Sequence, residues 1–255
     1  MKISCICATY NRFPIRSYLL EESVQSFLQQ SYEDKELIIV NDCPQQELAF
    51  EHEQVTVVNL PRRCRNLGEK YNLAVTMASG DYIAPWDDDD ISLPMRLAKA
   101  ADMLKRTGSH YYKPAGQWFL DSRGIGKLQS FVGHNSSVYS YKAFVKVNGY
   151  PSTSWGADTE LDRKLKSLGP NAICEVTVYD WQYIYRWGVS DLHLSSIHDE
   201  ADREKAWKAA ANKPVVPGKY TLAPKWLYDY SRHAQIIAKS GLSVYPIPDM
   251  EFWQR

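Results

Sequence analysis

The most informative segment of this chain is Ala78-Ser79-Gly80-Asp81-Tyr82-Ile83-Ala84-Pro85-Trp86-Asp87-Asp88-Asp89-Asp90-Ile91-Ser92-Leu93-Pro94. A short apolar strand predicted over 82–86 runs directly into four consecutive aspartates. Open α/β sheets bind their ligands at the carboxyl ends of strands. Like charges in a row raise one another's pKa unless a cation offsets them, and Mg²⁺ and Mn²⁺ prefer carboxylate oxygens. The run therefore predicts a divalent-metal site; the alternative is a solvated acidic turn.

Composition places the chain among ordinary globular proteins. Its 255 residues are 44% hydrophobic and 24% charged, and 30 Lys and Arg balance 30 Asp and Glu. Bulk charge therefore does not predict a nucleic-acid or membrane partner. The five scattered cysteines have no zinc-type spacing, which favours a reducing compartment. No apolar run approaches the ~20 residues of a membrane helix, and no signal-peptide pattern is seen. We expect a cytoplasmic protein without a transmembrane segment.

Residues 1–100 show the alternating strand and helix pattern of an α/β nucleotide-binding fold. Apolar runs predict buried strands over 2–8, 36–40, 55–60 and 82–86, and helical spacing predicts helices over 15–30 and 66–79, the second closed by Gly80. Three of these strands end in polar residues: Thr9 and Asn11, Asp42, and the aspartate run. In a parallel sheet these ends meet at one edge, which predicts a nucleotide site.

Five segments in order resemble family-2 glycosyltransferases with the GT-A fold: 8–12, 26–32, 36–42, 66–83 and the aspartate run. The resemblance implies an α/β protein with a Rossmann-like nucleotide-binding half, whose mostly parallel central sheet is flanked by helices, continuous with an acceptor-binding half. We expect a catalytic domain over 1–198, divided into a nucleotide-sugar half (1–100) and an acceptor half (101–198). A helical extension over 199–255 would follow.

The same resemblance assigns residues to the donor. The nucleotide-binding set is Thr9, Tyr10, Asn11, Arg12, Asp42, Arg65, Asn66, Lys70, Asp87 and Asp88. Asp42 would accept a hydrogen bond from N3–H of uracil, and Asp89 would bind the metal that bridges the diphosphate. The register stays open, because Asp87/Asp89 and Asp88/Asp90 both satisfy the Asp-x-Asp pattern. For Arg65 and Lys70, a place at a solvated helix start is an equal alternative.

In the second half, the segment from Trp155 resembles the family's Glu-Asp motif, with Ala157 in place of the glutamate. Asp158 is then the general base that deprotonates the acceptor hydroxyl, and helix capping is the alternative. Glu160 and Asp162 are the fallback candidates for the base.

The segment 181–196 resembles the loop that closes over the donor diphosphate in this family. This resemblance makes His193 the third metal ligand, and His198 is the alternative ligand. The donor- and acceptor-lining residues are His134, Trp155, Arg186 and Trp187. Arg186 would offer charge to the phosphates, and Trp187 would shield the site. For His134 a buried place in the core is the alternative.

These assignments imply an inverting transfer of a sugar from a nucleotide diphosphate to a hydroxyl group. We expect a UDP-sugar as donor, a glycan or another small molecule as acceptor, and Mn²⁺ or Mg²⁺ as cofactor. A nucleotidyltransferase is disfavoured, since 8–13 has no glycine-rich phosphate loop. A sugar-nucleotide-binding protein without catalysis remains an alternative. So does a phage-type enzyme that glycosylates modified bases in DNA, which rests on the basic and aromatic helix predicted over 226–239. Packing of that helix on the core is the favoured interpretation.

Overall fold

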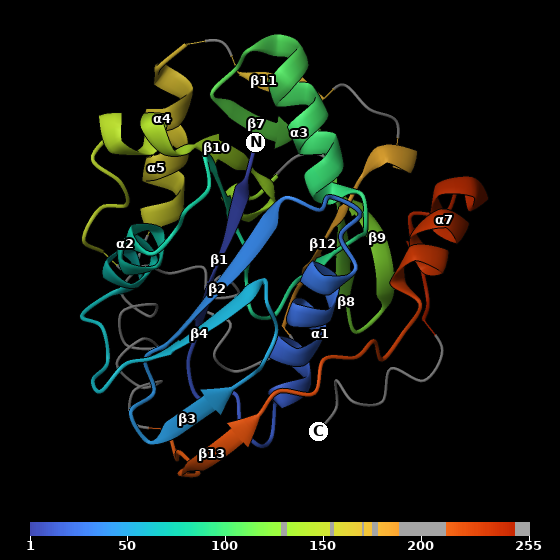
Figure 1. The fold of residues 1–255 in the computed structure, drawn as a ribbon. Coiled ribbons are helices and arrows are strands. Elements are labelled where there is room, and N and C mark those ends of the chain that lie inside the picture. Colours follow the sequence, from blue (N-terminus) through green and yellow to red (C-terminus); the bar gives the residue numbers. More distant parts are fainter. Residues whose placement is uncertain (129–131, 154–155, 170, 175–177, 189–212, 248–255) are drawn as a thin grey trace.

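The computed structural model describes residues 1–255 except 129–131, 154–155, 170, 175–177, 189–212 and 248–255 (Figure 1). Its largest sheet has the strand order β11-β7-β10-β5-β1-β2-β4. These strands are β11 (Ala172–Cys174), β7 (Tyr111–Pro114), β10 (Val138–Ser140), β5 (Tyr82–Pro85), β1 (Ile3–Thr9), β2 (Lys35–Asn41) and β4 (Val55–Asn59). Strand β10 is antiparallel to both neighbours, and the other pairs are parallel. The expected α/β fold with a mostly parallel central sheet is confirmed.

Helices cover both faces of this sheet (Figure 1). Alternate residues of β1 face opposite sides: Ile3, Cys5 and Cys7 pack with helices α1 (Ser17–Leu28) and α3 (Arg96–Thr107). Ile6 packs on the other side with α2 (Leu67–Thr76), α4 (Tyr141–Lys146) and α5 (Ala157–Ser167). Burial on both faces explains why the strand sequences are continuous apolar runs rather than alternating ones.

A second sheet begins where the aspartate run ends. Its order is β14 (Val244–Tyr245), β9 (Gly124–Leu128), β8 (Gln117–Asp121), β12 (Tyr183–Arg186) and β6 (Ile91–Ser92). Short 3₁₀ helices precede β10 and β12, η1 (His134–Ser136) and η2 (Val178–Asp180). Strand β5 of the first sheet and β6 of the second directly flank the four aspartates, so this loop bridges the two sheets.

The described C-terminal residues are built into the domain. Strand β13 (Gly218–Thr221) pairs in parallel with β3 (Gln46–Ala49), and neither strand was predicted. Helix α7 (Tyr230–Ser240) buries Tyr230, Ala234 and Ile237 against the second sheet, as the favoured interpretation expects. Residues 213–247 therefore contribute two strands besides one helix. The charged, alanine-rich sequence of 200–211 predicts a further helix, which lies outside the described residues. The domain boundary at 198 stays a prediction.

Two local predictions were wrong. The helix predicted to end at Gly80 ends at Thr76, with Met77 as its C-cap. Gly80 serves close packing instead: a Cβ there would lie 2.6 Å from Oγ and 2.8 Å from N of Ser4 on the neighbouring strand. The aromatic pattern of 172–187 predicts one long strand, but this stretch supplies β11 to the first sheet and β12 to the second.

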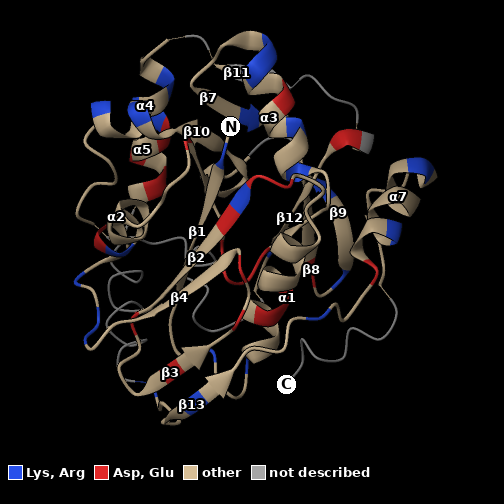
Figure 2. Ribbon diagram, in the orientation of Figure 1, with Lys and Arg blue, Asp and Glu red and all other residues tan. Residues whose placement is uncertain are grey.

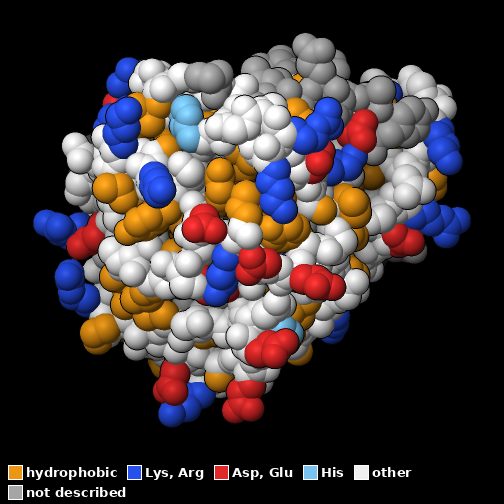
Figure 3. Space-filling model, turned by 45° about the horizontal axis from the view of Figure 1, so that its top comes forward, with side chains coloured by type: hydrophobic (Ala, Val, Ile, Leu, Met, Phe, Trp, Pro, Cys, Tyr) orange, Lys and Arg blue, Asp and Glu red, His pale blue; other side chains and the backbone are white. Residues whose placement is uncertain are grey.

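Charged side chains of both signs are scattered over the outer helices (Figure 2). The face drawn in Figure 3 likewise mixes acidic, basic and apolar side chains. In the part of the chain that the structure describes, no helix has the length and apolar character needed to cross a bilayer.

Candidate metal and nucleotide site

Three of the four consecutive aspartates form a carboxylate cluster after β5. One carboxylate oxygen from each of Asp87, Asp89 and Asp90 lies within 4.8 Å of the other two. Oxygen donors at this spacing fit Mg²⁺ or Mn²⁺. The cluster sits at the carboxyl end of β5, beside the ends of β1 and β2, where the sequence predicted a ligand site.

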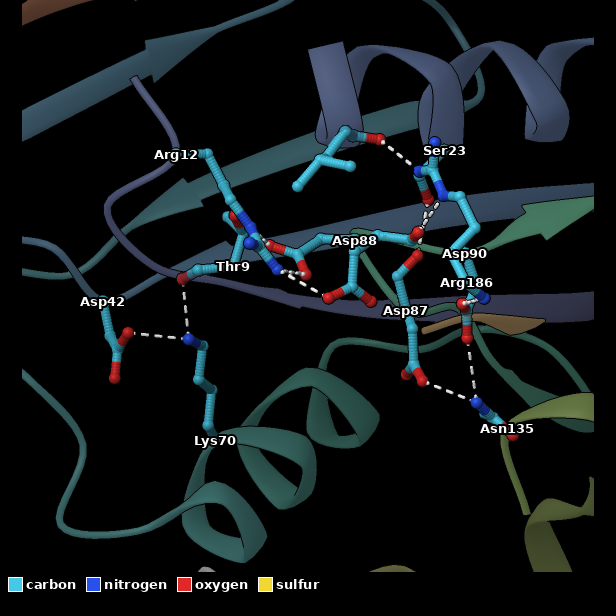
Figure 4. A network of polar contacts seen from close by, with 12 residues as sticks. Thr9, Arg12, Ser23, Asp42, Lys70, Asp87, Asp88, Asp90, Asn135 and Arg186 are labelled. Atoms are coloured by element: carbon cyan, nitrogen blue, oxygen red, sulfur yellow. Dashed lines mark hydrogen bonds and ion pairs between the residues drawn. The ribbon is translucent and has the colours of Figure 1, made fainter. Parts of the chain in front are cut away.

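Asp88 has a different role from its neighbours. Arg12, only 6% exposed, donates from Nε to Oδ2 at 2.8 Å and from Nη2 to Oδ1 at 2.6 Å of Asp88 (Figure 4). Burial would raise the pKa of Asp88, but the charge and hydrogen bonds of Arg12 outweigh it and lower the pKa. Arg12 also donates to Asp89 Oδ2 at 3.0 Å. Of the two registers left open, this grouping favours Asp87/Asp89 for the metal.

Asn135 bridges the carboxylates of Asp87 and Asp90 (Figure 4), a contact that the sequence did not suggest. Its Nδ2 donates to Asp87 Oδ2 at 2.9 Å and to Asp90 Oδ2 at 3.0 Å. Tyr71 donates to Asp87 at 2.9 Å, and Tyr183 donates to Asp90 at 2.5 Å. Burial and the neighbouring carboxylates still raise the pKa of Asp87 to about 6 and that of Asp90 well above its usual range. A bound cation would relieve this repulsion.

Lys70 and Asp42 form a buried ion pair at the ends of β1 and β2 (Figure 4). Lys70 Nζ lies 2.7 Å from Asp42 Oδ1 and donates to the Thr9 carbonyl at 2.6 Å. The backbone N–H of Cys64 donates to the other Asp42 oxygen at 3.0 Å. Of the two alternatives for Lys70, the structure therefore rules out a solvated helix start and joins it to two predicted nucleotide-binding residues.

The loop after β1 carries the next predicted residues. Tyr10 lies under the guanidinium of Arg63, with 4.1 Å between the Arg63 Cζ and the ring centroid. Asn11 has a φ of 50°, and its Nδ2 donates to the Pro214 carbonyl at 3.2 Å. This loop is thus held by the arginine-rich connection on one side and by the C-terminal segment on the other.

Arg65 and Asn66 lie at the start of α2. Asn66 is the N-cap and accepts a hydrogen bond from the Glu69 N–H at 2.8 Å. The Arg65 side chain is 75% exposed and pairs with Glu69 at 3.4 Å, as expected for a solvated helix start. Their predicted roles at the nucleotide stay predictions.

Arg186 is not where the sequence expectation placed it. Its side chain is fully buried and forms an ion pair with Glu22 at 2.6 Å instead of facing an open phosphate site. The neighbouring Trp187 is half-buried and contacts Phe119 and Tyr185, with ring centroids 5.9 and 6.0 Å away.

Asp158 is exposed on the first turn of α5. The N-cap of this helix is Gly156 with a φ of 58°, so the capping alternative for Asp158 is wrong. The fallback residue Glu160 pairs with Arg163 at 2.7 Å. The base assignment of Asp158 stays a prediction.

Asp162, the second fallback residue, belongs to a half-buried cluster. It accepts hydrogen bonds from Tyr111, from Lys113 at 3.0 Å and from Lys166 at 2.6 Å. Burial would raise the pKa of Asp162, but contacts to His134 and these partners hold it well below its usual range. A carboxylate paired in this way is a poor proton acceptor.

His134 is buried, as its alternative interpretation expects. It is 5% exposed, its Nε2 lies 3.2 Å from the Tyr150 hydroxyl, and its ring stacks on Tyr139 at 5.5 Å. The remaining predicted residues, Trp155 and His193, and the rival His198 lie outside the described residues.

Residues 4–164 match the family described as Glycosyl transferase family 2. The chain belongs to this family. It is 30% identical over 132 residues to the putative glycosyltransferase EpsE of Bacillus subtilis, covering 49% of this chain and 46% of EpsE. It is also 30% identical over 155 residues to WcaA of Escherichia coli, a putative colanic acid biosynthesis glycosyl transferase, covering 57% of this chain and 53% of WcaA. The chain thus spans about half the length of these family-2 relatives.

Solved structures confirm the GT-A arrangement. Residues 1–349 of S. aureus TarS in complex with UDP-GlcNAc align with a TM-score of 0.62 at 18% identity, over 83% of this chain and 66% of that 1–349 chain. The mannosyltransferase PcManGT of Pyrobaculum calidifontis, in complex with GDP-Man and Mn²⁺, aligns with a TM-score of 0.52 at 15% identity, over 93% of this chain and 69% of that one. At these identities the likeness concerns the fold of family-2 glycosyltransferases.

Proposed function

We propose that this chain is a metal-dependent, inverting glycosyltransferase that moves a sugar from a nucleotide diphosphate to a hydroxyl group. The observation that carries the proposal is the carboxylate cluster of Asp87, Asp89 and Asp90, placed after β5 and beside the ends of β1 and β2. Asp87, Asp89 and Asp90 would hold the divalent cation, which would supply positive charge to the diphosphate of the donor.

The chain's own residues prepare the donor site. A divalent cation held by the cluster would offset the charge that develops on the leaving diphosphate. Arg12 fixes the orientation of Asp88 and Asp89 by ion pairs at 2.6 and 3.0 Å. Because these contacts are formed before the donor arrives, little reorganisation is needed during the reaction.

For the donor we infer a UDP-sugar. Asp42 directly follows β2 and is buried, and Lys70 Nζ lies 2.7 Å from one of its carboxylate oxygens. In this proposal the Asp42 carboxylate accepts the hydrogen bond from N3–H of uracil. TarS, which binds UDP-GlcNAc, gives one of the structural alignments and supports this choice. As part of the same proposal, the sugar of this donor is transferred to a hydroxyl of a glycan or another small molecule.

Inversion requires a base on the face of the sugar opposite to the leaving group. We assign this base to Asp158, whose exposed carboxylate lies on the first turn of α5.

The test is a panel of nucleotide sugars, each measured with and without Mn²⁺ for thermal stabilisation, hydrolysis and transfer. A ligand that binds only the native state at about 100 times its Kd stabilises it by about 2.7 kcal/mol. We expect stabilisation by UDP-sugars that depends on Mn²⁺, and turnover that EDTA stops and Mn²⁺ restores. Stabilisation without hydrolysis or transfer would favour the non-catalytic binding protein, and turnover in the absence of any divalent ion would contradict the metal site.

A further inference from the structure

Glu22 of α1 and Arg186 of β12 form an ion pair that is completely buried. Both side chains are 0% exposed, and Glu22 Oε2 lies 2.6 Å from Arg186 Nη1. Burying two charges costs free energy that their attraction offsets only when the remaining polar atoms are also satisfied. The other contacts of the two residues therefore show what the pair holds in place.

Arg186 holds the backbone and a side chain of the metal-binding loop. Its backbone N–H donates to Asp90 Oδ1 at 2.7 Å, and its Nε donates to the Asp89 carbonyl. The Asp90 carboxylate is thus fixed from the β12 backbone, while the peptide after Asp89 is fixed from the guanidinium. Ser23, next to Glu22 on α1, donates to the Asp87 carbonyl at 2.7 Å. The loop is therefore held by α1 and β12, at the carbonyls of Asp87 and Asp89 and at the carboxylate of Asp90.

Glu22 connects this loop to the C-terminal segment. Its Oε1 accepts hydrogen bonds from the Leu227 N–H at 2.9 Å and from the Tyr230 hydroxyl at 2.9 Å. Tyr230 is itself 2% exposed. Both residues lie beyond the family match, which ends at residue 164. The metal loop of this chain is thus supported by a part of the sequence that the family match does not include.

We propose that Glu22, Arg186 and Tyr230 are positioning residues that hold the Asp89–Asp90 backbone in the geometry required to bind the divalent ion. This inference rests on the proposed function, because it assumes that the carboxylate cluster binds a metal. The three residues act through the loop, and none of them is assigned a contact with metal or donor.

The test measures Mn²⁺ binding directly, without donor, by electron paramagnetic resonance. Arg186→Lys keeps the positive charge near Glu22 but loses the guanidinium geometry that reaches the Asp89 carbonyl. Residues that orient metal ligands change metal affinity by about 10- to 100-fold when they are altered. We expect the Mn²⁺ dissociation constant of Arg186→Lys to rise about 10-fold. The Mn²⁺ concentration for half-maximal turnover should rise by the same factor, with the donor KM at saturating Mn²⁺ within about two-fold of wild type.

Tyr230→Phe provides a second, milder variant that leaves the charges intact. It removes the Tyr230 hydroxyl that donates to Glu22, and we expect a two- to four-fold weaker Mn²⁺ affinity. Glu36→Gln is the matched control, because Glu36 is a hydrogen-bonded acid at the start of β2, next to Ser79, at the strand end opposite to the cluster. It should lower the melting temperature and leave the Mn²⁺ affinity unchanged.

The outcomes separate the two proposals. If wild-type protein binds Mn²⁺ and both Arg186→Lys and Tyr230→Phe bind it equally well, the positioning role is wrong while the metal site stands. The same holds if Glu36→Gln weakens Mn²⁺ binding as much as Arg186→Lys does, since the effect would then follow stability alone. If the wild-type protein binds no Mn²⁺, the metal-dependent function and the positioning role both fail.

Discussion

Asp158 is exposed and lies on the first turn of α5. The Asp158→Asn variant keeps the size of the side chain and removes its ability to accept a proton. We expect kcat to fall by about 100-fold or more, with UDP affinity within a few-fold of wild type, because general-base catalysis contributes about 10²- to 10⁴-fold. Steady-state transfer kinetics measure kcat, and calorimetric titration measures the dissociation constant of UDP.

Glu160→Gln is the control for this prediction, since Glu160 lies on the same helical turn and its carboxylate pairs with Arg163 at 2.7 Å. This variant should retain nearly full activity. A fully active Asp158→Asn enzyme would remove the base assignment.

At the scale of the elements, the packing of β1 against the turn before β5 depends on Gly80. The Gly80→Ala variant places a Cβ within 2.8 Å of the Ser4 backbone nitrogen, and backbone atoms in a sheet cannot move aside easily. We expect a loss of about 2 to 3 kcal/mol in the free energy of unfolding, in the upper range for overpacked sites. Urea denaturation measures it.

The comparison variant is Gly108→Ala. Gly108 caps α3 with a φ of 64°, and a methyl group added there would meet no other atom within 4 Å. The left-handed backbone alone should cost about 1 kcal/mol. Equal losses in the two variants would show that close packing at Gly80 is not the cause.

The start of β2 predicts a pH dependence of stability. Glu36 accepts hydrogen bonds from Ser4 and Ser79 at 2.6 and 2.7 Å and pairs with Lys2 at 2.8 Å. Although burial acts to raise it, these contacts lower the pKa of Glu36 to about 2. A lowered pKa in the folded state means stability that is present above the unfolded value of about 4.5 and lost as the pH falls towards 2.

We therefore expect Glu36→Gln to be less stable than wild type by about 1 to 2 kcal/mol at pH 6, a value that allows for solvent screening of a partly exposed site. The difference should shrink as the pH falls from about 4.5 to 2. Urea denaturation at several pH values measures it, and a difference that does not change with pH would contradict the role of the Glu36 charge.

At the scale of the whole molecule, the C-terminal segment supports the loop after β1. Gln46 of β3 is 2% exposed, and its Nε2 donates to the carbonyls of Phe13 at 2.7 Å and Val216 at 3.1 Å and to Asn11 Oδ1 at 3.2 Å. The Gln46→Met variant keeps the length of the side chain and removes all three hydrogen bonds, although the Val216 carbonyl keeps the Tyr220 hydroxyl as a donor at 3.0 Å. Each buried unsatisfied group costs about 1 to 3 kcal/mol, so the loop after β1 would be held less firmly in this conformation. Because this loop carries predicted nucleotide-binding residues, we expect UDP to bind about 5- to 10-fold more weakly.

Calorimetric titration with UDP measures this change. Gln54→Met is the control, because Gln54 donates to the Glu33 carbonyl at 2.9 Å on an exposed part of the surface. It should bind UDP like the wild type. If Gln46→Met lowers stability but binds UDP normally, the loop after β1 does not depend on the C-terminal segment for its nucleotide-binding geometry.

Much of the fold could be predicted because its signals are local. The buried strands β1, β2, β4 and β5 appear as apolar runs of strand length, and the structure places them within about two residues of the predicted ranges. The aspartate run, and the polar residues that end β1 and β2, follow these strands directly in the sequence. Parallel pairing then brings them together without further information, because all carboxyl ends of parallel strands meet at one edge.

Only the tertiary structure decided which polar atoms pair. Glu22 and Arg186 are 164 residues apart, Gln46 and Val216 are 170 apart, and Asn135 reaches Asp87 and Asp90 from an element that carries no motif. Strand β13 pairs with a strand as short as itself, β3, and both lack a clear apolar period. Periodicity reports which face of an element is buried, but a single polar contact between distant segments leaves no periodic trace. The sequence therefore determined the sheet and the place of the acids, whereas packing decided which acids cluster, which are neutralised by arginine, and that the C-terminal segment supports them.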